Sequence, residues 1–257
     1  MTHDPIWTRS RMIGEPAFIG GHRGASLEAA ENSREAFQQA ISLGADFIEF
    51  DWRLTRDGVP VVFHDDTPER LNGDQRTIDQ IDFSELRAIA SDLMTVGEAL
   101  EAVGGRISVL LDTKITQPEG LAAGLDLLAP HLGNPAAVAF GTRSLEASAV
   151  VRRRLPESPV LGLFRDIGDY PALREMGGSW ARLWEEDATG EAIDALRALG
   201  LKVIVMVGLP TPDGVGEITS DGMVALLRLR PDAVMLNDVR LGLAARGHLS
   251  QPNSPGG

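Results

Sequence analysis

Short apolar runs alternate with amphipathic patterns along almost the whole chain. Nine runs have the length and composition of strands: Ala17–Gly21, Phe47–Asp51, Val59–His64, Ile107–Asp112, Ala136–Phe140, Val160–Phe164, Ala181–Trp184, Val203–Val207 and Ala233–Leu236. The segments between them have helical spacing: Asn32–Leu43, Ser84–Ala90, Val96–Val103, Pro118–His131, Ser144–Leu155, Glu191–Leu199, Gly222–Leu229 and Val239–Arg246. Strands that alternate with helices favour a parallel sheet. The pattern therefore predicts an α/β fold.

The link between the second and third runs is the exception to this rhythm. Residues 52–58 are too few for a crossover helix, and Asp57-Gly58 suits a hairpin turn. We therefore expect Val59–His64 to fold back antiparallel beside the second strand, which leaves eight parallel strands. For 257 residues this predicts a single domain over residues 1–257, a (β/α)8 TIM barrel with a β-hairpin extension after the second strand. Met1–Pro16 is expected to be an irregular N-terminal extension, and Gln251–Gly257 a disordered tail.

The composition limits the partners of such a barrel. A net charge of −13, without a stripe of Lys and Arg interleaved with aromatic residues, disfavours nucleic acid. No segment approaches the roughly 18 uncharged apolar residues of a membrane span, and the first 16 residues lack an apolar leader pattern. We expect no stable membrane insertion and a cytoplasmic location. The absence of cysteine excludes thiolate metal sites and a cysteine nucleophile, and the oligomeric state stays open.

Acidic residues gather at the ends of two predicted strands. Glu49 and Asp51 are two apart, so their side chains share one face about 7 Å apart. Asp112 ends a later strand and can supply a third oxygen ligand. Carboxylates alone favour Mg²⁺, with Ca²⁺ as the alternative, over zinc. The other interpretation is a set of solvated acids at strand ends.

Two histidines are expected on the same rim. His22 ends the first strand and His64 ends the hairpin strand. Imidazole titrates near neutrality, so one ring can accept a proton from the attacking oxygen while the other donates one to the leaving alcohol. Which ring does which is open, and a lone histidine is more often an ordinary polar residue.

Basic residues near these acids are candidates for binding an anionic substrate. Arg23 can contact phosphate oxygens in a bidentate manner, and Lys114 can act as a point charge. Alternatively, Arg23 pairs with an acid such as Glu31 and Lys114 forms a local salt bridge. For Arg143, the favoured interpretation is the exposed start of the following helix. The second interpretation is that it recognises an anionic head group.

Two more residues have several interpretations. Asn32 precedes a helix, where capping is as plausible as substrate contact. Trp184 ends a predicted strand, where it can line a pocket for the alcohol.

Several motifs together resemble one known family. They are Gly21-His22-Arg23-Gly24-Ala25, Glu31-Asn32-Ser33, the stretch from Gly44 to Asp51, Thr55-Arg56-Asp57-Gly58, the stretch from Val61 to Asp66, and Asp112-x-Lys114. This set resembles the glycerophosphodiester phosphodiesterase family, most densely from Ile19 to Asp66. The resemblance implies a TIM barrel enzyme that hydrolyses glycerophosphodiesters to an alcohol and glycerol 3-phosphate with a divalent cation. It implies metal ligands Glu49, Asp51 and Asp112, the acid/base pair His22 and His64, and phosphate contacts Arg23 and Lys114.

Three departures from the family pattern keep alternatives open. Asp112 stands where a glutamate is usual, which resembles the venom-type phospholipase D enzymes that leave a cyclic phosphate. The insertion after His64 is nearly absent, and Val203–Gly208 replaces a tryptophan-containing strand. A phospholipase D-like cleavage of lysophospholipids or related diesters, or a catalytically idle barrel that binds phosphorylated ligands, therefore stays possible. A Schiff-base aldolase built on Lys114 is a more distant alternative.

Overall fold

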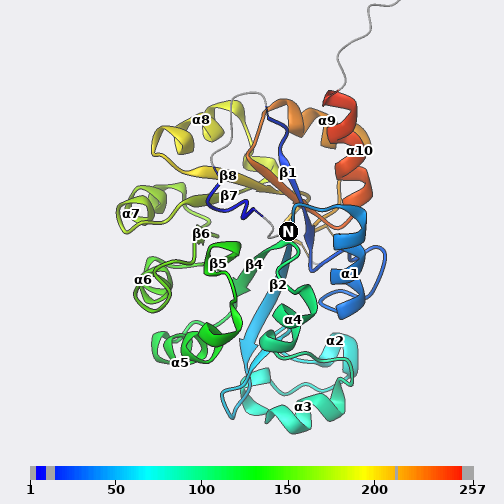
Figure 1. Cartoon of the computed structure of the whole chain (residues 1–257), viewed down its shortest axis with the longest axis vertical. Helices are drawn as coiled ribbons and strands as arrows, with labels where there is room; N and C mark the ends of the chain where they lie inside the picture. Colours follow the sequence, from blue (N-terminus) through cyan, green and yellow to red (C-terminus); the bar gives the residue numbers. More distant parts are fainter. Residues whose placement is uncertain (1–3, 10–14, 212–213, 251–257) are drawn as a thin grey trace, which may run out of the picture.

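Eight parallel strands close into a barrel in the computed structural model, which describes residues 4–9, 15–211 and 214–250 (Figure 1). In sheet order the strands are β1 (Phe18–His22), β9 (Ala233–Leu236), β8 (Lys202–Met206), β7 (Trp180–Trp184), β6 (Val160–Gly162), β5 (Val138–Thr142), β4 (Ser108–Thr113) and β2 (Phe47–Leu54). Because β1 also pairs with β2, the ring is complete. The predicted (β/α)8 barrel is confirmed.

The ninth strand, β3 (Pro60–Val62), lies outside the ring. It pairs antiparallel with the far end of β2, with Arg53 opposite Val61. Gly58 in the connecting turn has a φ of +79°, which suits a residue without a Cβ. A small apolar core under the hairpin includes residues of η1 (Ile78–Gln80) and α3 (Phe83–Ile89). Figure 1 shows β2 running beyond the barrel toward α2 and α3. The hairpin prediction is confirmed, although the strand itself spans only Pro60–Val62 of the predicted Val59–His64.

Helices surround the barrel, and those that follow the predicted pattern begin and end close to the expected residues. They are α1 (Arg34–Leu43), α3, α4 (Val96–Val103), α5 (Pro118–Leu128), α6 (Leu145–Arg154), α8 (Gly190–Ala198), α9 (Ser220–Arg228) and α10 (Val239–Ser250). The helical range predicted at Pro118–His131 is α5 followed by the single 3-10 turn η2 (Ala129–His131). The sequence pattern did not predict two short helices, α2 (Glu69–Asn72) and α7 (Tyr170–Glu175), or the single 3-10 turns η3 (Pro135–Ala137), η4 (Ile167–Asp169) and η5 (Glu185–Asp187). Elements of one or two turns are too short to show a helical period.

Alternation along the strands separates two cores. Ile48 and Phe50 point outward into the layer between strands and helices, whereas Phe47 points into the barrel. The amino-terminal end of the barrel is closed by Trp7, which is 1 % exposed. Its ring lies 5.1 Å from Phe47 and 5.3 Å from Trp180 in edge-on contacts. The described part of the expected N-terminal extension thus completes the barrel core.

The predicted tail, Gln251–Gly257, lies outside the described residues, as do residues 1–3 and 10–14. Among the helices that the structure describes, none has the length and apolar character needed to cross a membrane.

Candidate active site

The carboxyl ends of β1, β2 and β4 carry most of the predicted site residues. Glu49 and Asp51 follow Phe47 on the inward face of β2, as the alternation of the strand requires. The parallel register places Glu49 beside His22 of β1 and Asp51 beside Asp112 of β4. Three strands that are neighbours in the ring therefore bring these side chains to one side of the barrel mouth.

Glu49, Asp51 and Asp112 form one buried group of carboxylates. Their candidate ligand oxygens lie within 4.8 Å of one another. Burial, followed by the charges of Asp51 and Asp112, raises the pKa of Glu49 well above its ordinary value. Burial also opposes the charge of Asp51, but the positive charges around it, that of Lys114 first, outweigh burial and lower its pKa. Three oxygen donors this close could hold a divalent cation, which would offset their repulsion.

Two basic side chains neutralise part of this acidic group. The Nζ atom of Lys114 lies 2.9 Å from a carboxylate oxygen of Asp51 and 2.9 Å from one of Asp112. Arg143 directly follows β5 and contacts both oxygens of Asp112, with Nη2 2.6 Å from Oδ2. Ser144, not Arg143, caps helix α6. Arg143 is exposed, as the favoured interpretation expected, but it precedes the helix cap and its guanidinium lines the cavity in the barrel mouth.

Arg23 links the first strand to the acidic group. Its backbone adopts a φ of +57°, which costs a non-glycine residue about 1–2 kcal/mol. In this conformation its backbone N–H donates to Oε2 of Glu49 at 3.0 Å, and its side chain donates to Glu31 at 2.9 Å. Its Nε atom lies 3.5 Å from Oδ2 of Asp51. The expected ion pair with Glu31 is therefore present beside the carboxylates.

His22 has a fixed ring orientation. Its Nδ1 atom lies 2.8 Å from Oδ1 of Asn237, which follows β9. The amide nitrogen of Asn237 donates to the carbonyl of Val215 and to Glu217, each at 2.9 Å. Because that nitrogen is engaged, the amide oxygen accepts from Nδ1–H of His22, which leaves Nε2 as an acceptor. Burial, followed by the charge of Arg23, lowers the pKa of His22 to about 4.

His64 is held by a carboxylate instead of an amide. Its Nδ1 atom lies 2.7 Å from Oδ1 of Asp65, whose other oxygen accepts a hydrogen bond of 2.6 Å from Arg70. Arg70 also contacts Glu31, which binds Arg23. A continuous polar network therefore joins His64 to Arg23 along one edge of the site.

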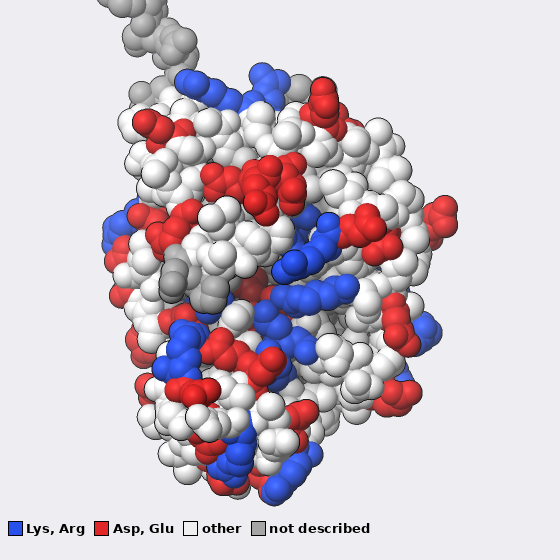
Figure 2. Space-filling model, turned by 180° about the vertical axis from the view of Figure 1, so that it is seen from behind, with Lys and Arg blue, Asp and Glu red and all other residues white. Residues whose placement is uncertain are grey.

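These residues share one cavity at the carboxyl end of the barrel, of about 1030 Å³. It is lined by all seven predicted site residues, His22, Arg23, Glu49, Asp51, His64, Asp112 and Lys114. Trp184 also lines it. Figure 2 shows this face of the molecule, where Lys and Arg side chains gather around a central hollow. The predicted residues are thus brought together in one accessible place.

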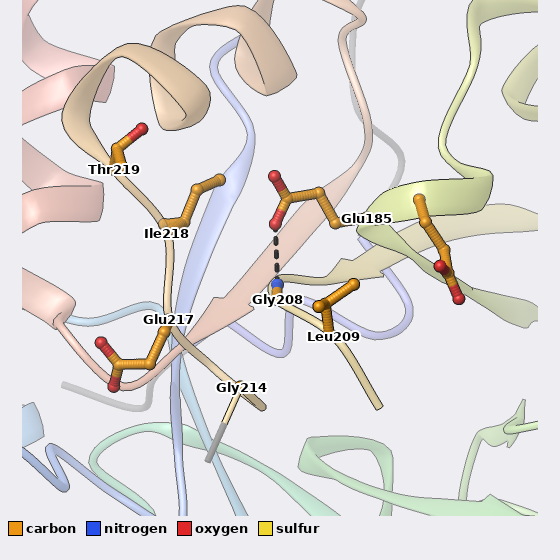
Figure 3. Close-up of a pocket in the computed structure, with 8 residues that line it drawn as sticks. Glu185, Gly208, Leu209, Gly214, Glu217, Ile218 and Thr219 are labelled. Carbon is orange, nitrogen blue, oxygen red and sulfur yellow. Dashed lines mark hydrogen bonds between the residues drawn. The ribbon is translucent and has the colours of Figure 1, made fainter. Parts of the chain in front are cut away.

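A separate hollow lies next to the mouth, between the ends of β7 and β8 and the start of α9. Figure 3 shows that Glu185, Gly208 and Glu217 line it. A carboxylate oxygen of Glu185 accepts a hydrogen bond of 2.7 Å from the backbone N–H of Gly208. Glu217 connects this hollow to the active site, because it supports Asn237.

Comparison with known proteins identifies the family. The model of the glycerophosphoryl diester phosphodiesterase family matches residues 22–239. The chain belongs to this family.

The fold of this family member is similar to that of a solved phosphodiesterase. A structure of an Oleispira antarctica phosphodiesterase in complex with the product sn-glycerol-3-phosphate superposes with a TM-score of 0.76 at 20% identity. The match covers 90% of this chain and 96% of that chain and supports the fold.

Lysophospholipase D GDPD3 of Mus musculus is 41% identical over 78 residues, or 30% of this chain and 24% of that protein. A glycerophosphodiester phosphodiesterase of Caldanaerobacter subterraneus is 40% identical over 68 residues, or 26% of this chain and 28% of that protein. The chain therefore spans about a quarter of the length of these two relatives.

Two contacts of the site were not predicted from the sequence of this family member. Asn237 was visible as a polar residue after the last strand, but its partner His22 lies at the other end of the sequence. Asn32 does not cap the helix: Ser33 is the cap, and the amide nitrogen of Asn32 donates to Asp51 at 3.0 Å. A closed ring makes β9 a neighbour of β1, which is the signal that could have pointed to Asn237.

Proposed function

We propose that this chain is a metal-dependent phosphodiesterase that hydrolyses glycerophosphodiesters to an alcohol and glycerol 3-phosphate. The observation that carries the proposal is a buried group of three carboxylates with two oriented histidines in the same cavity. Membership of the phosphodiesterase family supports it. So does the product named for the Oleispira antarctica relative, sn-glycerol-3-phosphate.

Glu49, Asp51 and Asp112 are the residues that would hold the cation. Their donor set is entirely oxygen, which favours Mg²⁺, with Ca²⁺ as the alternative. When bound, a divalent cation supplies Lewis-acid stabilisation to a phosphodiester oxygen. Lys114 and Arg23, both beside the carboxylates, are placed to neutralise the charge that develops on the phosphoryl group.

The two histidines take different roles in this proposal. His22 presents Nε2 as an acceptor, since the Oδ1 atom of Asn237 accepts a hydrogen bond from Nδ1–H. A neutral ring of this kind can remove a proton from the attacking hydroxyl group or water. His64 has Asp65 beside its Nδ1 atom, and a carboxylate balances the charge of an imidazolium ring better than an amide does. We therefore assign His22 as the general base and His64 as the general acid that protonates the leaving oxygen.

A second function is favoured by a groove beside His64. This groove, of about 360 Å³, is lined in part by apolar side chains, including Phe63, Leu71 and Leu93. An acyl chain would fit such a surface, and the Mus musculus relative is named a lysophospholipase D. Cleavage of a lysophospholipid, with attack by a substrate hydroxyl to give a cyclic phosphate, is therefore the alternative reaction.

The aldolase alternative is disfavoured by the state of Lys114. Burial opposes its charge, but Asp51 and Asp112 outweigh burial, so the pKa of Lys114 is raised. A Schiff-base lysine needs a lowered pKa to act as a nucleophile. A binding-only barrel and a cytoplasmic location both stay predictions from the sequence.

The test is the steady-state hydrolysis of glycerophosphocholine with Mg²⁺ by the wild type and by His22→Ala and His64→Ala. Each variant should lose about 10²–10⁴-fold in turnover if it removes a general base or acid. His248→Ala is the matched control, because His248 is exposed on α10 and should leave turnover unchanged. Losses below tenfold in both active-site variants would contradict the assigned roles.

A further inference from the structure

The barrel mouth has two halves of different charge. The acidic group and His22 come from β1, β2 and β4. Arg143 follows β5, Arg165 follows β6, and Arg182 belongs to β7. All of them line the same cavity. Figure 2 shows basic side chains around the hollow of this face. Arg143 neutralises Asp112, whereas the proposed chemistry gives Arg165 and Arg182 no role.

Arg182 is the least expected of these residues. It lies between Trp180 and Trp184 on the inward face of β7, and it is only 7 % exposed. Its Nη2 atom donates to the carbonyl of Leu163 at 3.1 Å, and its guanidinium lies 4.4 Å from the centre of the Trp184 ring. Its buried Nη1 atom has no hydrogen-bond partner. A buried guanidinium without a balancing anion is costly, so a fold retains one for a reason.

The other charges around Arg182 increase this cost. Burial first, and the nearby charges of Arg143 and Arg165 among the further causes, lower the pKa of Arg182 to about 10, although Tyr170 and Asp112 oppose them. Arg143 is balanced by its contact with Asp112. Within the described part of the chain, neither Arg182 nor Arg165 forms an ion pair with a carboxylate.

Acidic residues on the same rim do not supply the missing partner. Asp166 and Asp169 line the cavity next to Arg165. The carboxylate of Asp166 instead accepts the backbone N–H of Gly168 at 2.8 Å and so caps η4. Asp169 is exposed at the start of α7. An anion that enters the cavity would therefore meet two unbalanced guanidinium groups.

We propose that Arg182 and Arg165 form a second anion-binding subsite in the active-site cavity, which selects phosphodiesters whose second alcohol carries an anionic group of its own, a carboxylate or a phosphomonoester. This inference rests on the proposed function for its substrate class. The diester phosphate occupies the acidic half of the mouth, and the extra anion lies against Arg182, with Trp184 beside it. Arg165, which is exposed, closes over the same anion from the segment after β6.

A pair of ligands that differ by one carboxylate tests the subsite. Glycerophosphoserine carries that group on its alcohol, and glycerophosphoethanolamine lacks it. Calorimetric titration in the His22→Ala/His64→Ala background measures both affinities with Mg²⁺ and without consumption of the ligand. We expect the serine diester to bind at least about tenfold more tightly, since charge-assisted hydrogen bonds are among the stronger ones.

Single substitutions in that background assign the preference to residues. Arg182→Gln should reduce the ratio of the two affinities to near one, and Arg165→Gln should reduce it by a smaller factor. Arg165→Gln also guards against a folding defect of the buried substitution, because Arg165 is exposed. Arg153→Gln is the matched control: Arg153 is exposed on α6 outside the cavity, so its loss changes the net charge equally but should leave the ratio intact.

The outcomes separate this inference from the proposed function. Equal affinities for the two ligands in the His22→Ala/His64→Ala background would overturn the subsite, and so would a preference that survives both arginine substitutions. A preference that depends on Arg182, combined with no hydrolysis of either diester by the wild type, would uphold the subsite and reject the phosphodiesterase activity.

Discussion

The contact between Asn237 and His22 gives a quantitative test of the assigned base. Asn237→Ala removes the acceptor that lies 2.8 Å from Nδ1, so the ring loses the hydrogen bond that selects its orientation and tautomer. Such a bond is worth about 1 kcal/mol net, and each 1.4 kcal/mol or so of barrier changes a rate about tenfold. Because the neutral ring can then carry its proton on either nitrogen, we expect kcat to fall by about 5-fold and KM to change little.

The assay is steady-state release of phosphomonoester over a range of glycerophosphocholine concentrations. Asn134→Ala is a matched control, since Asn134 caps η3 away from the cavity and should leave kcat unchanged. Glu217→Gln keeps an acceptor oxygen for the amide nitrogen of Asn237 and should cost less than Asn237→Ala. A kcat for Asn237→Ala within twofold of the wild type, or a rise in KM alone, would refute the claim that Asn237 orients the base.

Other substitutions test the metal site and the barrel core. Glu49→Gln should weaken Mg²⁺ binding in calorimetry by about tenfold or more, because it removes a charged oxygen ligand, whereas the exposed Glu35→Gln should not. Unchanged affinity in Glu49→Gln would exclude this residue as a ligand. Trp7→Ala should lower the free energy of unfolding in urea by about 3–5 kcal/mol, the usual cost of truncating a buried tryptophan. A loss below about 1 kcal/mol would mean that the N-terminal segment is not part of the barrel core.

Most of the fold follows from local patterns in the sequence. The alternation of apolar runs and helical spacing predicts eight parallel strands. Asp57-Gly58 predicts the hairpin that places the ninth strand outside the ring. The role of Trp7 could not be predicted in this way. Its partners Phe47 and Trp180 are distant in sequence, and a short segment without periodicity gives no sign that it fills the end of a barrel.

The site was predictable where it depends on strand ends and less so where it depends on side-chain direction. Parallel strands end at one rim, so Glu49, Asp51 and Asp112 could be grouped from their positions alone. Arg143 could not be placed, because a residue between a strand and a helix cap can point outward or into the mouth. The carboxylate of Asp112 on the neighbouring strand attracts Arg143 into the mouth, and this proximity can be recognised only once the register of the two strands is known.

The most direct test of the proposed function is ³¹P NMR of the purified protein with glycerophosphodiesters and lysophospholipids, in Mg²⁺, in Ca²⁺ and in EDTA. The account predicts a phosphomonoester signal from the glycerophosphodiesters that grows with the divalent cation and is lost in EDTA. A persistent cyclic phosphate would support the lysophospholipase D-like reaction in place of direct hydrolysis. Turnover that continues unchanged in EDTA, or none under any condition, would contradict a metal-dependent phosphodiesterase at this site.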